Sequence, residues 1–159
     1  MNNLTNLILQ SSLGKELSDS QAEELSALMH SRDLVDGEFL FEEGATDNSL
    51  YVLVKGKLEV MKRTSMDAMA SLAVLRDGDL AGELSFIDSQ VHSVGLRALC
   101  NCQVLSLKRK DFEALVDKDP QIVYKVMRAV ARSAHRIVHS MNYESIELSN
   151  YIFKQHGRY

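Results

Sequence analysis

The chain has 159 residues, of which 45% are hydrophobic and 25% charged, and its formal net charge is −4. This composition is typical of one globular domain with one core. No apolar run is long enough to span a bilayer, and the first residues lack the charged start and apolar stretch of a signal peptide, so we expect a cytoplasmic protein. The acidic total argues against general nucleic-acid binding, which usually needs a basic surface.

Residues 1–31 have the pattern of short helices. Leu4, Leu7 and Ile8 fall on one helical face. Ser18 and Ser20 each precede a Gln or Glu by three residues, which is the spacing of a capping box, so either serine can begin a second helix.

In residues 32–110 the apolar residues recur with a period of two, and glycines divide the segment into short runs, as expected of short strands in a small roll. Residues 50–54 are apolar on both faces, which predicts a buried strand. Residues 66–71 are expected to form a mobile hairpin loop, and residues 98–107 the last strong strand. The predicted fold is mainly β with flanking helices (α+β), a double-stranded β-helix or jelly-roll β-roll.

Residues 111–159 return to a helical period. A short helix is expected over residues 111–116, and Asp119-Pro120 has the cap and first-turn residues of a longer one. Its apolar stripe continues for more turns than a small roll can cover, so we expect a homodimer through this C-terminal helix. Ile137→Glu would then place a charge in the dimer seam. The chain as a whole reads as one domain.

Two motifs resemble a known family. The first is residues 35–44, VDGEFLFEEG, followed by residues 50–56, LYVLVKG. The second is Gly82-Glu83-Leu84-Ser85-Phe86, followed after five residues by His92-Ser93-Val94. Together they resemble the cyclic-nucleotide-binding domain family, the cAMP receptor protein-like β-roll. The first motif is specific for the fold, and the second resembles the cassette with which that family binds the cyclic phosphate.

The resemblance implies a role for each cassette residue. Gly82 and Glu83 open a one-turn helix, Glu83 accepts from the ribose 2′-hydroxyl, and Leu84 and Ser85 offer amide groups to the phosphate, as helix N-termini do for anions. Ser93 offers its hydroxyl. In the family an arginine pairs with the phosphate.

His92 stands where the family has that arginine, and Val94 stands where a small alanine is usual. His92 either contacts a phosphate only when it is protonated, or marks a pocket that has lost or changed its ligand. Arg97 is an alternative source of the missing charge.

The far end of the chain departs from the family as well. Members that bind cAMP place a Thr-Ser pair that reads adenine where this chain has Ile137 and Val138, counted from Pro120 without gaps. In the family's transcription factors the long helix leads into a helix-turn-helix domain. We expect a stand-alone module without that domain and therefore no specific DNA binding.

Other ligands have weaker support. Cys100 and Cys102 are either a metal or redox pair or two small residues facing a core, and His135 and His139 have an i, i+4 metal spacing without a third ligand. A haem on His92 is the least favoured cofactor. No catalytic constellation can be placed, so we expect no enzyme, no metal site and no cofactor apart from a cyclic nucleotide ligand, cAMP or cGMP.

The predicted function is a regulatory module that senses a small anionic ligand and signals through its C-terminal helix to an unknown protein partner, with no membrane association. The alternative is a dimeric interaction or scaffold protein with a degenerate, non-binding pocket. The ligand-binding residues would be those of the cassette: Gly82, Glu83, Leu84, Ser85, His92, Ser93 and Val94.

Overall fold

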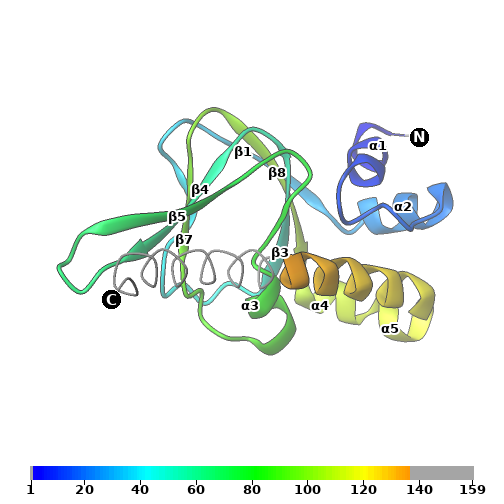
Figure 1. Ribbon diagram of the computed structural model, residues 1–159. Coiled ribbons are helices and arrows are strands. Elements are labelled where there is room, and N and C mark those ends of the chain that lie inside the picture. Colours follow the sequence, from blue (N-terminus) through cyan, green and yellow to red (C-terminus); the bar gives the residue numbers. More distant parts are fainter. Residues whose placement is uncertain (1, 137–159) are drawn as a thin grey trace, which may run out of the picture.

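A computed structural model describes residues 2–136 and shows two antiparallel four-stranded sheets, with the helices of the two ends of the chain packed together on one side of them (Figure 1). The strands are β1 (His30–Leu34), β2 (Phe39–Phe41), β3 (Ser49–Lys55), β4 (Leu58–Arg63), β5 (Met69–Leu75), β6 (Leu80–Ala81), β7 (Gly95–Ala98) and β8 (Cys102–Lys108). One sheet has the order β1-β8-β3-β6 and the other β2-β7-β4-β5. The expected β-roll is confirmed.

The described helices all contribute to one apolar cluster against this roll. They are α1 (Asn3–Gln10), α2 (Asp19–Ser26), α3 (Glu83–Asp88), α4 (Arg109–Glu113), α5 (Leu115–Lys118) and a C-terminal helix that occupies residues 120–136 of the described part. Ser18 begins α2 with a complete capping box, in which Gln21 is the reciprocal partner. The amide of Ile122 donates to the Asp119 side chain, so the expected cap of the C-terminal helix is present.

Two apolar clusters explain why residues 50–53 are apolar on both faces. Leu50 and Val52 point toward the helices, where they pack with Ile122, Val126 and other helical residues. Tyr51 and Leu53 point into the roll between the two sheets. Because successive side chains of a strand alternate between its faces, β3 is buried on both sides and joins the two clusters.

The prediction of one strand over residues 98–107 is wrong. Residues 99–101 form a turn between β7 and β8, which belong to different sheets. The amide of Leu99 donates to the carbonyl of Lys57 at 3.0 Å, which holds the turn at the edge of the roll. An apolar run therefore contains the step from one sheet to the other, which a local pattern does not distinguish from a continuous strand.

The predicted loop over residues 66–71 is shorter than expected. Strand β5 already begins at Met69, and β4 and β5 pair as a hairpin that extends from the roll (Figure 1). The amide of Thr64 donates to the carbonyl of Ala68 at 2.7 Å, and Asp67 takes the left-handed conformation that the tight turn needs.

No helix within residues 2–136 is long and apolar enough to cross a membrane. Ile137 and the expected dimer seam beyond it, His139 of the candidate metal pair, and Val138 lie outside the described residues.

Candidate ligand-binding cassette

The cassette begins where β6 ends, at a glycine that the backbone requires. Gly82 has φ 77°, in the left-handed region, and a Cβ atom there would lie 2.9 Å from the carbonyl oxygen of Ser49. Helix α3 follows directly, and Ser89 ends it in the left-handed conformation. The first turn of a helix has no intrahelical acceptors for its amides, so Leu84 and Ser85 present N–H groups at this end, as the sequence predicts.

Glu83 is held inside the protein by the C-terminal helix. Its side chain is buried, and the hydroxyl of Ser133 donates to its Oε1 atom at 2.8 Å. Burial raises the pKa of the Glu83 carboxyl, and the hydrogen bonds from its own backbone amide and from Ser133, with the positive charge of Arg136, act in the opposite direction. Glu83, whose carboxylate is predicted to accept from a ribose hydroxyl, therefore also joins the cassette to the C-terminal helix through Ser133.

His92 is buried in an aromatic stack. Its ring lies 3.6 Å from that of Phe41, centroid to centroid, with an angle of 11° between the planes. Only 4% of the residue is exposed. Its Nδ1 atom lies 3.1 Å from the hydroxyl of Ser85, and within residues 2–136 its Nε2 atom is buried without a hydrogen-bond partner.

The backbone fixes this position from both sides. The amide of His92 donates to the carbonyl of Ala45 at 2.9 Å, and the carbonyl of His92 accepts from the amide of Gly44 at 2.7 Å. Desolvation lowers the pKa of the His92 imidazole, although the nearby Asp47 raises it in part. His92 is therefore a neutral side chain at pH 7 and offers no permanent charge to a phosphate.

The remaining cassette residues are closer to solvent. Leu84 is 64% exposed, Ser93 is exposed and Val94 is half-buried. The ammonium of Lys62 on β4 donates to the carbonyl of Ser93 at 2.8 Å and to Glu43 at 2.9 Å, so the cation beside this end of the cassette is already paired with a carboxylate. Arg97, the alternative source of charge, likewise pairs with Glu59 at 2.9 Å.

Three residues of this site were not predicted from the sequence: Phe41, Lys62 and Ser133. Ser133 carried a usable signal, because it is a polar residue at a buried position of an otherwise apolar helical stripe. Phe41 and Lys62 carried no such signal in the sequence, because an apolar strand residue and an exposed lysine are common in any roll.

In the described part of the chain, no three His, Cys, Asp or Glu residues come together in a group that could hold a metal ion. Cys102 is buried and its thiol donates to the carbonyl of Lys57 at 3.3 Å, while Cys100 is half-buried in the turn before β8. Burial raises the pKa of the Cys102 thiol, which disfavours the reactive thiolate.

Comparison with known proteins agrees with this architecture. The chain is 29% identical over 121 residues to the cAMP-activated global transcriptional regulator CRP of Salmonella typhimurium, covering 76% of this chain and 58% of the relative. The solved N-terminal domain of a transcriptional regulator from Streptomyces coelicolor has a TM-score of 0.72 at 30% identity, covering 82% of this chain and 94% of that domain. A cyclic nucleotide-binding domain from Methylobacillus flagellatus has a TM-score of 0.81 at 19% identity, covering 92% and 82%.

The roll, the cassette helix and the C-terminal helix thus have the fold of cyclic nucleotide-binding domains. Residues 31–119 match the family described as the cyclic nucleotide-binding domain, and the chain belongs to that family. It spans 58% of the length of the curated CRP relatives that it matches.

Proposed function

We propose that this chain is a regulatory module whose cassette binds a small anionic ligand, a cyclic nucleotide such as cAMP or cGMP, and signals through its C-terminal helix. It acts by binding and not by catalysis. The observation that carries the proposal is the buried 2.8 Å hydrogen bond from Ser133 to Glu83, because it joins the cassette directly to that helix.

The bond gives the ligand a means of moving the helix. A ligand hydroxyl that donates to Glu83 competes with Ser133 for the same carboxylate oxygen. Binding then releases Ser133 and shifts the helix between two packings. The signal passes to a protein partner or to a second copy of the chain, since we also propose a homodimer through this helix.

Removing the Ser133 hydroxyl tests this competition. Ser133→Ala leaves Glu83 available in the free protein, so calorimetry with cAMP and cGMP should show affinity about 2- to 10-fold higher than for the parent. Gln121→Ala, at the exposed start of the same helix, should leave the affinity unchanged. Hydrogen exchange along residues 126–136 should increase when ligand binds the parent. Equal affinity in parent and Ser133→Ala, or no change in exchange, would contradict the mechanism.

A second function is favoured by one observation. The His92 ring is stacked on Phe41 and its Nδ1 atom lies beside the Ser85 hydroxyl, so these two contacts are made without a ligand, while Nε2 has no partner within residues 2–136. This is the arrangement expected of a dimeric interaction or scaffold module with a degenerate pocket. Such a protein would sediment as a dimer and would gain no thermal stability from cAMP or cGMP, whereas specific binding to the folded state must raise it.

A further inference from the structure

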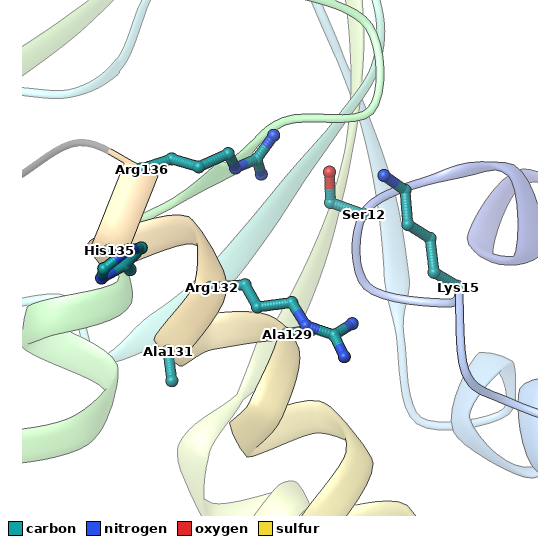
Figure 2. Close-up of a pocket in the computed structure, with 7 residues that line it drawn as sticks. All are labelled: Ser12, Lys15, Ala129, Ala131, Arg132, His135 and Arg136. Carbon is teal, nitrogen blue, oxygen red and sulfur yellow. The ribbon is translucent and has the colours of Figure 1, made fainter. Parts of the chain in front are cut away.

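A pocket of about 570 Å³ lies between the C-terminal helix and the segment that follows α1. Figure 2 shows the side chains of Arg132 and Arg136 extending from the helix toward Ser12 and Lys15. Ala129 and Ala131 add small apolar surface, and His135 completes the lining. The volume is within the range of small-molecule sites, about 300–1,000 Å³.

The charges around this pocket are unbalanced. Its lining contains Lys15, Arg132 and Arg136, and no carboxylate among the described residues. The chain as a whole is acidic, with 22 Asp and Glu against 18 Lys and Arg. A local concentration of positive charge on an acidic protein attracts anions to that place.

The spacing of arginines along the C-terminal helix indicates what kind of ligand this positive charge would bind. Arg128, Arg132 and Arg136 follow one another at intervals of four residues and so lie on one face, where like charges repel. Glu16 compensates the first two: its Oε1 atom lies 3.3 Å from Arg128 and 2.6 Å from Arg132. These contacts lower the pKa of the Glu16 carboxyl, which stays ionised.

One helical turn further on, no described carboxylate forms an ion pair with Arg136. Within residues 2–136, Arg136 and Lys15 have neither an ion pair nor a side-chain hydrogen bond, although the positive charge of Arg136 acts on the buried carboxyl of Glu83. Glu16 contacts both Arg128 and Arg132. A negative group bound in the pocket would contact Arg132 and Arg136 in the same way.

We propose that this pocket binds a soluble anion that carries at least two phosphate groups, held between Lys15, Arg132 and Arg136. Arg132 already pairs with Glu16, so Lys15 and Arg136 are the cations that a ligand would neutralise, and a diphosphate carries enough negative charge to pair with both. The site is separate from the cassette and does not depend on the function proposed above.

Calorimetry with inorganic pyrophosphate, in a buffer without phosphate, tests the proposal on the full chain. We expect a dissociation constant of about 1 mM or tighter that weakens as salt is raised. The double variant Lys15→Gln/Arg136→Gln should bind at least about tenfold more weakly. Arg128→Gln is the matched control, because Arg128 also pairs with Glu16 but does not line the pocket, and its affinity should stay within about twofold of the parent.

Amide chemical shifts identify the place of binding. Pyrophosphate should shift the amides of Lys15 and Ala131, which lie at the pocket, and leave those of Leu84 and Ser93 at the cassette unchanged. Both substituted side chains are exposed, so the double variant should keep the parent's melting temperature. The proposal is overturned by absence of binding at about 10 mM pyrophosphate, by equal affinity in the double variant, or by shifts confined to the cassette.

Discussion

Replacing His92 by arginine should create tight cyclic-nucleotide binding. In the parent, the neutral imidazole offers a phosphate at most one donor, and its Nδ1 atom already lies beside the Ser85 hydroxyl. An arginine adds a permanent charge and two parallel N–H donors, and its planar guanidinium can stack on Phe41 as the imidazole does. Hydrogen bonds to charged groups contribute about 1.5–3 kcal/mol, so His92→Arg should strengthen binding about ten- to a hundredfold.

The same reasoning gives the parent a pH dependence. Burial holds the pKa of the free His92 below its ordinary value of 6.5, and a bound phosphate raises it because it favours the charged form. The affinity of the parent should therefore increase as pH falls through the bound-state pKa, and level off below the free-state pKa. His92→Arg should bind with no such dependence, since arginine stays charged throughout.

Calorimetry with cAMP and cGMP at about pH 5.8 and about pH 7.8 measures both effects. His92→Gln is the control, because glutamine is neutral at both pH values and should show neither the gain nor the pH dependence. Tight, pH-independent binding by the parent would refute the reasoning and would point to another cation, Arg97 or Lys62, released from its carboxylate partner. Absence of any gain in His92→Arg would show that the pocket is closed by other groups, with the half-buried Val94 first.

Four further predictions follow from the same structure. The folded-state pKa of His92 is depressed, so the unfolded chain binds more protons below pH 6.5. The free energy of unfolding should therefore fall as pH falls from 6.5 through the folded-state pKa. In denaturant titrations, His92→Phe should reduce this slope by up to about 1.4 kcal/mol per pH unit. Gly82→Ala should cost at least about 1 kcal/mol more than Gly37→Ala, since both glycines have positive φ but only at Gly82 would the new Cβ meet the Ser49 carbonyl; equal melting temperatures for the two variants would contradict this. This chain alone should form no specific DNA complex at about 10⁻⁸ M in anisotropy titrations at physiological salt. Sedimentation should show a dimer for the parent and a monomer for Ile137→Glu, and a monomeric parent at tens of micromolar would end the dimer proposal.

The parts of this protein that follow from the sequence are those set by neighbouring residues. The capping box at Ser18 needs only Gln21, and the turn into α3 needs only a residue that tolerates a positive φ, which is Gly82. The period-two pattern and its glycines likewise predicted a roll, and the cassette motif predicts where a ligand would bind it.

Tertiary structure decided what the cassette side chains touch. His92 meets Phe41 because β2 and the segment before β7 are brought together, and Glu83 meets Ser133 because the C-terminal helix packs over β3. These pairs are far apart along the chain, so no local pattern couples them, and each depends on how two separate elements pack. The protonation of His92 belongs to the same category, because the desolvation that lowers its pKa is produced by all the groups that bury it.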